Sequence, residues 1–182
     1  MILVDYIDHN KYTRPEIKRS RTSGIVMHST AVAGATAYNQ RDSFNRSHVQ
    51  VYRSAHYAVG WDGAVIAIIP NNEKAYHCGA WKYQEGIVKK LGPDPNMTTI
   101  GIEMCHKYQN GRLETITLFY AQLLVVHLCF KYDLNPCSDV FRHYDITGKQ
   151  CPLWWVQYPQ EYLKFQLAVK KAMCMDIGAI KP

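Results

Sequence analysis

The sequence predicts a single α/β domain in which a mixed β-sheet is flanked by helices. Three observations lead to this fold class. Short β-branched and apolar runs indicate buried strands, an Asp-Gly pair between two such runs indicates a hairpin, and two long segments show helical spacing of apolar residues. Strands followed by helices, with a hairpin among the strands, favour a mixed sheet covered by helices. A chain of 182 residues is long enough for one domain with a sizeable core.

The expected strands lie in three segments. GIVMHSTA (24–31) has a β-branched, apolar centre and predicts a buried strand that ends in polar residues. Segment 54–70 predicts two strands joined at Asp62 and Gly63, because glycine accepts the positive φ that a tight hairpin turn requires. TTIGIEMCH (98–106) predicts a further strand.

One charged residue interrupts the apolar pattern of the last of these strands. Side chains alternate between the two faces of a strand, so Glu103 should project from the face opposite Ile100, Ile102 and Met104. A lone carboxylate in an apolar strand is costly to bury without a partner or a task. The residues alone leave two interpretations open, a structural ion pair and a functional carboxylate.

Three helices are expected around the sheet. Segment 34–47 predicts the first, and 116–132 predicts the clearest one, with Thr115 or Thr117 as its N-cap. Segment 159–173 predicts an amphipathic helix that begins with proline, a residue favoured in the first turn.

We expect one domain over residues 1–175, followed by a tail or linker stub over 176–182, where the periodicity is lost. Asp5 and Asp8 follow Met1 closely without a long apolar run, so no signal peptide is expected. No segment is expected to reach transmembrane length, so membrane insertion is not expected. The six cysteines form no CxxC pair, and free thiols in this number are typical of synthesis in a reducing cytoplasm.

The chain is basic, with a formal net charge of +6. This charge favours an anionic partner, either nucleic acid or an acidic polymer such as a bacterial wall. The basic residues are spread along the chain, and the densest run, KRSR (18–21), comes with no nucleic-acid-binding motif. We therefore expect no nucleic-acid partner.

Segment 141–155, FRHYDITGKQCPLWW, concentrates reactive side chains in a predicted loop. A metal site, a cysteine nucleophile and a merely polar loop are alternative interpretations of His143, Lys149 and Cys151. His28, at the end of a predicted buried strand, adds another potential ligand. Zinc binds imidazole nitrogen and thiolate sulfur, and catalytic zinc sites keep one position open. The spacing alone does not decide, because ordinary hydrogen bonding is the commoner use of a histidine.

Five motifs occur in an order that resembles a known family. They are IVMHSTA, SAHYAVGWDG, AYHCG, TIGIEMC and HYDITGKQCP. Together they resemble the zinc-dependent N-acetylmuramoyl-L-alanine amidases of the second type, a group that includes phage endolysins and is related to the peptidoglycan recognition proteins. The resemblance covers about residues 20–160. Its most specific part is a histidine followed after seven residues by Cys-Pro, with a lysine two positions before the cysteine.

The resemblance implies one zinc ion per chain, held in a surface groove by His28, His143 and Cys151. Since the metal would hold the sulfur as thiolate, a nucleophilic role for Cys151 is not expected. The resemblance also implies that Glu103 acts as general base and that Lys149 stabilises the developing oxyanion. An ion-paired Glu103 and a solvated Lys149 are the alternatives.

The same resemblance points to residues near the substrate. His77 matches a histidine that lines the groove in relatives, and we expect it to contact substrate rather than metal. Trp81 and Tyr83 are expected to stack on sugar or peptide at the groove rim. The Gly- and Pro-rich loop 86–97 is expected to shape specificity. Ala55 departs from the family pattern, because some relatives carry a second catalytic tyrosine there, and proton transfer would then rest on Glu103.

The implied reaction is hydrolysis of the amide bond between N-acetylmuramic acid and L-alanine in bacterial peptidoglycan. The protein would be a phage endolysin or autolysin, synthesised in the cytoplasm, that acts as a monomer on the wall after release. Two alternatives are a peptidoglycan-binding module without catalysis and a cytoplasmic amidase that recycles muropeptides. Cys151 argues against the first, because non-catalytic relatives commonly lose that ligand. The SAHY and IGIE motifs argue against the second, because they are closer to those of the endolysins.

Overall fold

The mixed sheet that the sequence predicts forms the centre of the described part of the protein, where it has six strands. The computed structural model describes residues 1–46 and 50–179, with 176–179 described by backbone alone. The strands are β1 (Leu3–Val4), β2 (Gly24–Ser29), β3 (Tyr57–Val59), β4 (Val65–Ala67), β5 (Thr99–Met104) and β6 (Val140–Arg142). The helices are α1 (Ala37–Phe44), α2 (Ile87–Leu91), α3 (Thr115–Tyr132), α4 (His143–Thr147), α5 (Leu153–Gln157) and α6 (Pro159–Ala179), with the 3-10 helix η1 (Pro95–Met97).

The strands follow the order β1-β4-β3-β5-β2-β6 across the sheet. β3 and β4 form the antiparallel hairpin that the Asp-Gly pair predicts, and Gly63 has a φ of 88° in its turn. The other neighbouring strands pair in parallel. β2 pairs with β5 along its whole length, so the carboxyl ends of these two central strands lie side by side.

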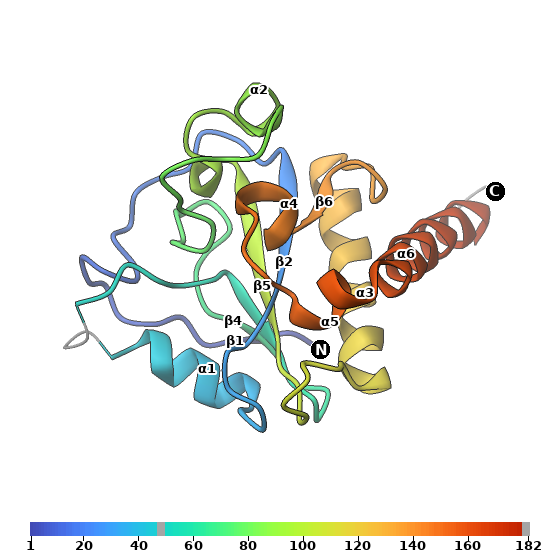
Figure 1. Ribbon diagram of the computed structural model, residues 1–182, viewed down its shortest axis with the longest axis horizontal. Coiled ribbons are helices and arrows are strands. Elements are labelled where there is room, and N and C mark those ends of the chain that lie inside the picture. Colours follow the sequence, from blue (N-terminus) through green and yellow to red (C-terminus); the bar gives the residue numbers. More distant parts are fainter. Residues whose placement is uncertain (47–49, 180–182) are drawn as a thin grey trace.

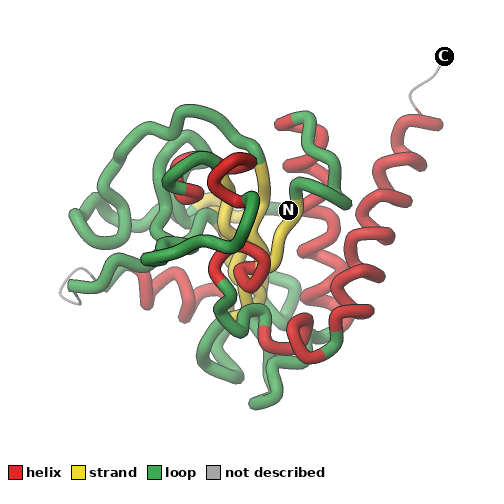
Figure 2. Tube along the Cα trace, turned by 45° about the horizontal axis from the view of Figure 1, so that its top comes forward, coloured by secondary structure: helices red, strands yellow, loops and turns green. Residues whose placement is uncertain are grey.

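Helices cover one face of the sheet, and loops with short helices cover the other (Figures 1 and 2). Ile25 and Ile102 project into a core shared with α3, α5 and α6. Val26 projects to the opposite face, where it packs with side chains of α2 and α4. Ala58 lies on that same opposite face with side chains of α1. The alternation predicted for the strand around Glu103 is therefore confirmed.

The N-cap of α3 differs from the prediction. Glu114, rather than Thr115 or Thr117, is the capping residue, and its side chain makes no cap hydrogen bond. Thr117 lies inside the first turn and is fully buried. Its hydroxyl lies 3.3 Å from the carbonyl oxygen of Cys105 and 3.5 Å from that of Gly60, so it links the helix to the loops beneath it instead of capping it.

α3 also corrects the expectation that no segment reaches transmembrane length. Its 18 residues have a mean hydropathy of 1.3, so by length and composition alone the helix is long and apolar enough to span a membrane. The physical reason is its place in the core. Besides Thr117, its buried residues belong to the core shared with the sheet and α6, and they are Ala121, Leu124, Val125, Val126, Leu128 and Cys129.

Two predicted helix boundaries also move. α1 begins after Thr36, whose hydroxyl accepts a hydrogen bond from the Asn39 N–H while the Asn39 side chain accepts one from the Thr36 N–H. The predicted end of that helix, Ser47, lies outside the described residues. α6 continues through Ala179 and so includes much of the predicted tail, whose last residues, 180–182, also lie outside the described part.

Two predicted loops contain helices. Segment 86–97 includes α2 and η1. Segment 141–155 runs from β6 through α4 into α5, because an Arg–Asp pair caps α4 and a glycine ends it. Helical spacing is not readable in segments of five residues, since they span little more than one turn.

Candidate metal centre

His28 and Glu103 lie side by side at the carboxyl ends of two parallel strands. They are register partners on β2 and β5, and both project from the face opposite α3 and α6. In open α/β sheets, ligands bind at the carboxyl ends of the strands. His28 is buried at 2% exposure, and Glu103 is partly buried.

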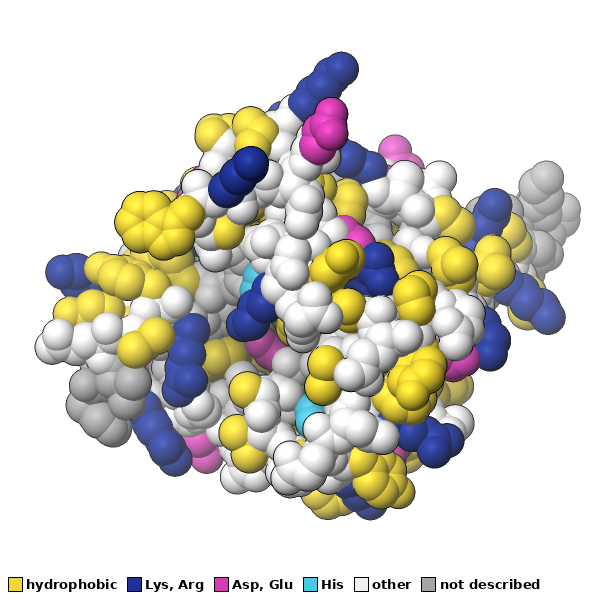
Figure 3. Space-filling view, viewed as in Figure 1, with side chains coloured by type: hydrophobic (Ala, Val, Ile, Leu, Met, Phe, Trp, Pro, Cys, Tyr) yellow, Lys and Arg dark blue, Asp and Glu magenta, His cyan; other side chains and the backbone are white. Residues whose placement is uncertain are grey.

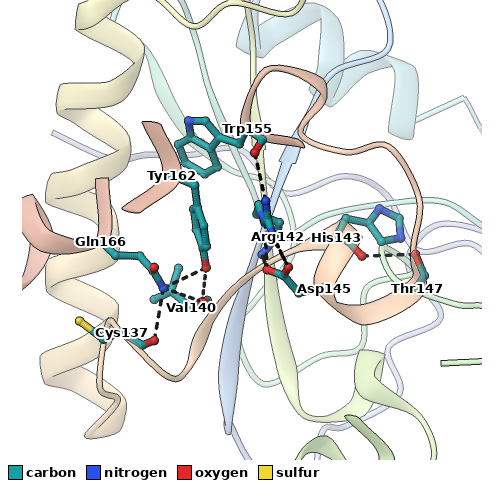
Figure 4. Close-up of polar contacts among 9 residues, drawn as sticks. All are labelled: Cys137, Val140, Arg142, His143, Asp145, Thr147, Trp155, Tyr162 and Gln166. Carbon is teal, nitrogen blue, oxygen red and sulfur yellow. Dashed lines mark hydrogen bonds and ion pairs between the residues drawn. The ribbon is translucent and has the colours of Figure 1, made fainter. Parts of the chain in front are cut away.

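His143 is placed by the junction of β6 and α4. It is the first residue of α4, and the residue before it, Arg142, is tied to Asp145 one turn later (Figure 4). The Arg142 guanidinium donates to Asp145 at 2.6 Å and to the Trp155 carbonyl at 3.0 Å, while the Arg142 N–H donates to Asp145 at 2.8 Å. This clamp fixes the direction in which α4 leaves the sheet and therefore the position of the imidazole.

The long helix α6 also holds β6, the strand that ends at Arg142. The Tyr162 hydroxyl and the Gln166 amide both donate to the Val140 carbonyl in β6 (Figure 4). Gln166 also donates to the carbonyl of Pro136 at 3.1 Å. Both side chains are buried, so these bonds are shielded from water.

The turn after α4 brings Cys151 back to His28. Gly148, with a φ of 79°, ends α4 in a left-handed conformation and supplies the turn. The Tyr144 N–H donates to the Cys151 carbonyl at 2.9 Å and closes the turn. The Ser29 N–H points at the Cys151 sulfur at 3.4 Å, next to His28.

Three buried atoms that could bind a metal ion therefore converge from distant parts of the chain. His28 Nδ1 lies 3.1 Å from His143 Nδ1 and 3.9 Å from Cys151 Sγ, and all three atoms lie within 4.8 Å of one another. Zinc bond lengths in a tetrahedral shell would place two nitrogens about 3.3 Å apart and a nitrogen and a sulfur about 3.6 Å apart. Two imidazoles and a thiol at these separations fit a zinc ion.

The electrostatics of the two imidazoles agree with metal binding, and those of the thiol disagree with a cysteine nucleophile. Burial lowers the pKa of His28 well below its ordinary value, and burial together with Lys149 lowers the pKa of His143 to about 4. Both imidazoles are therefore neutral, the form that binds metals. Burial and the Glu103 carboxylate raise the pKa of the Cys151 thiol to about 12, whereas a nucleophilic cysteine needs a lowered pKa.

Burial also perturbs the carboxyl group of Glu103. Burial raises its pKa from 4.5 to about 7, although the positive charges of Lys149 and Arg53 act in the opposite direction. Its Oε2 is shielded from solvent and has no hydrogen-bond partner among the described residues. A structural ion pair would show a close cationic partner, and none of the described ion pairs includes Glu103.

These residues line a cavity of about 220 Å³, which includes the three ligand side chains, Glu103 and Lys149. A second cavity of about 500 Å³ adjoins it and shares His143, Lys149 and Arg53. A hollow near the centre of this face is bordered by acidic, basic and histidine side chains (Figure 3). Arg53 is not predicted by the sequence, because a single arginine ahead of a strand carries no spacing signal.

His77 also lines both cavities, as its predicted place in the groove requires. It is 8% exposed, and its ring contacts His28 and Thr99. Trp81 is fully exposed, and Tyr83 packs beside a hydrophobic cluster under α2 and α4. Neither lines the two cavities, so their contact with substrate stays a prediction. Ala55 is fully buried in the cluster beneath α1.

Comparison with known proteins identifies the chain's relatives. A family model described as N-acetylmuramoyl-L-alanine amidase (Amidase_2) matches residues 18–154. The N-acetylmuramoyl-L-alanine amidase BlyA of Bacillus subtilis (strain 168) is 40% identical over 174 residues, which cover 92% of this chain and 46% of BlyA. The N-acetylmuramoyl-L-alanine amidase CwlL of Bacillus licheniformis is 39% identical over 171 residues, with the same two coverages of 92% and 46%. The chain thus spans slightly less than half the length of these curated relatives.

Solved structures confirm the fold class. The PlyG catalytic domain superposes with a TM-score of 0.75 at 23% identity, covering 95% of each chain. The family model, which matches most of the chain, and the two relatives near 40% identity show that the chain belongs to the Amidase_2 family of N-acetylmuramoyl-L-alanine amidases.

Proposed function

We propose that this domain uses one zinc ion to hydrolyse the amide bond between N-acetylmuramic acid and L-alanine in peptidoglycan. One observation carries the proposal: within a member of this amidase family, a His-His-Cys ligand set, a carboxylate and a lysine line the same cavity. Each of these groups has a part in metal-assisted amide hydrolysis.

His28, His143 and Cys151 would hold the ion, and zinc bound there supplies a Lewis acid for the amide carbonyl and makes water more acidic. Glu103 takes a proton from the attacking water and delivers it to the leaving amine. A raised pKa of about 7 suits both steps, because the carboxylate and the carboxylic acid are then both accessible near neutral pH.

Lys149 supplies positive charge where the reaction develops negative charge. It lines the cavity with Glu103, and its charge acts on the pKa of Glu103, His28 and His143, so it lies within electrostatic reach of the reacting atoms. An ammonium group beside the carbonyl oxygen stabilises the oxyanion of the tetrahedral intermediate.

The proposed partner is therefore the bacterial wall, with its glycan and stem peptide. A basic chain with a net charge of +6 is attracted to an anionic polymer of this kind. The domain would act on the wall as a monomer.

Purified protein and isolated cell walls test the proposal. We expect about one zinc per chain by metal analysis and loss of wall lysis after chelation, with recovery when zinc is added. Lysis that persists after complete removal of metal would exclude the zinc mechanism. Parallel assays on intact walls and on soluble muropeptides test the substrate, and exclusive cleavage of soluble muropeptides would instead identify a recycling enzyme.

A further inference from the structure

His77 joins the metal centre to the interior of the protein through both nitrogens of its ring. Its Nδ1 lies 3.2 Å from Nε2 of His28, and its Nε2 lies 3.3 Å from the hydroxyl oxygen of Thr99. The Thr99 hydroxyl in turn lies 2.7 Å from the Pro95 carbonyl oxygen. The three side chains are buried, so these groups rely on one another rather than on water.

The donors and acceptors in this series of hydrogen bonds can be assigned from the Pro95 carbonyl, at its inner end. A carbonyl oxygen can only accept, so the Thr99 hydroxyl donates to Pro95 and its oxygen accepts from the Nε2–H of His77. A neutral imidazole carries one proton, so Nδ1 of His77 holds a lone pair and accepts from the Nε2–H of His28. This leaves the lone pair of His28 on Nδ1, the atom that faces His143 and Cys151.

The residues around His77 hold its ring in one orientation. A Cβ on Gly101 would lie only 2.6 Å from Cγ of His77, so the ring packs directly on the backbone of β5 at a position where only glycine leaves room. The Asn96 side chain accepts hydrogen bonds from the His77 N–H at 3.0 Å and from the Cys78 N–H at 2.9 Å. These contacts fix both the backbone and the ring.

We propose that His77 is a positioning residue that fixes the tautomer and ring orientation of His28, so that Nδ1 of His28 presents its lone pair to the metal. The proposal rests on the zinc site of the proposed function. It differs from the substrate contact expected from the sequence, because both nitrogens of His77 are engaged within the protein. Metal-binding histidines need such an acceptor on the far side of the ring.

Loss of the acceptor should weaken the metal site without dismantling it. In His77→Leu, the Nε2–H of His28 loses its partner, and we expect zinc affinity to fall about 10- to 100-fold. His77→Asn places a carbonyl oxygen near the position of Nδ1, so it should recover most of that loss. Thr99→Val removes the hydroxyl that accepts from Nε2–H of His77, and it should lower zinc affinity by a smaller factor.

The experiment measures zinc affinity by chelator competition on the folded variants, and ring tautomers by nitrogen-15 NMR of the chain before and after zinc addition. Urea unfolding of the metal-free proteins checks that each variant is folded. Thr117→Val is the matched control, because it deletes another fully buried threonine hydroxyl, on α3, that contacts carbonyls and lies outside both cavities. It should leave zinc affinity and the His28 tautomer unchanged.

The proposal predicts that His28 carries its proton on Nε2 in the native chain and that this preference weakens in His77→Leu. Native zinc affinity in a folded His77→Leu variant would overturn it, as would a native His28 with its proton on Nδ1. If His77→Leu does not fold, the Thr99→Val and Thr117→Val pair decides, and equal zinc affinity in the two would overturn the proposal. A native chain that binds no zinc would instead refute the proposed function.

Discussion

Replacing Glu103 with glutamine should slow catalysis and stabilise the metal-free protein at the same time. The substitution keeps the shape of the side chain and removes its ability to accept a proton. A general base contributes about 10²- to 10⁴-fold to the rate, so kcat/KM should fall by about that factor. Zinc binding should persist, because none of the three proposed ligands changes.

The stability gain follows from the burial of the carboxylate. Burial raises its pKa from 4.5 in the unfolded chain to about 7 in the folded protein. At about 1.4 kcal/mol per pKa unit, the ionised form costs the folded state about 3 kcal/mol. Between pH 4.5 and 7 the folded state binds more protons than the unfolded state, so this cost grows as the pH rises and is complete above pH 7.

The assay is urea unfolding of the metal-free native chain and of Glu103→Gln at pH 4 and pH 8, since a bound zinc ion would offset the cost. We expect the variant to be more stable by up to about 3 kcal/mol at pH 8 and nearly equal to the native chain at pH 4. Glu85→Gln, at an exposed carboxylate, is the control and should change neither stability nor activity. Equal stability at pH 8 would show that burial of the ionised carboxylate has no cost, and near-native lysis by Glu103→Gln would exclude Glu103 as the base.

Three further predictions concern the surroundings of the site. Lys149→Met should lower kcat about 10²- to 10³-fold while metal analysis finds an unchanged zinc content, and unchanged kcat would contradict an oxyanion role. Arg142→Ala breaks the clamp to Asp145 and should lower the free energy of unfolding by about 1.5–3 kcal/mol in urea, whereas unchanged stability would show that the clamp is not structural. His56, buried with a pKa lowered to about 3, accepts the Gly101 N–H at Nδ1 and should remain neutral in the fold. Because the unfolded chain binds that proton near pH 6.5, stability should fall by about 1.4 kcal/mol per pH unit from this residue as the pH drops towards 3, and His56→Gln should show a correspondingly weaker acid dependence in urea unfolding.

The sequence predicted strands β2 to β5 and the long helices α1, α3 and α6, because their patterns extend over several residues. The alternation around Glu103 and the Asp-Gly turn each depend on local chemistry that the sequence displays directly. The two-residue strand β1, the three-residue strand β6 and the five-residue helices α2, α4 and α5 were not predicted, because so few residues show no period. The Thr36 cap of α1 has a readable signal in Asn39, three residues later, yet the predicted helix begins at residue 34.

At the site, sequence reasoning brought together His28, His143 and Cys151, and the structure places their ligand atoms in one buried cluster. It did not predict the tertiary contacts that support them. Arg53 reaches the cavity from a segment without a motif, and the Arg142–Asp145 clamp depends on a helix too short to recognise. The contacts of His77 with His28 and Thr99 depend on a hydrogen-bond geometry that only the three-dimensional structure reveals.

Mass analysis of the products released from purified cell walls identifies the bond that this domain cleaves. We expect stem peptides with a free L-alanine amino group, glycan strands with intact N-acetylmuramic acid, and no products after chelation until zinc is added back. Cleavage within the glycan, cleavage inside the peptide, or unchanged product release from the metal-free protein would contradict this expectation.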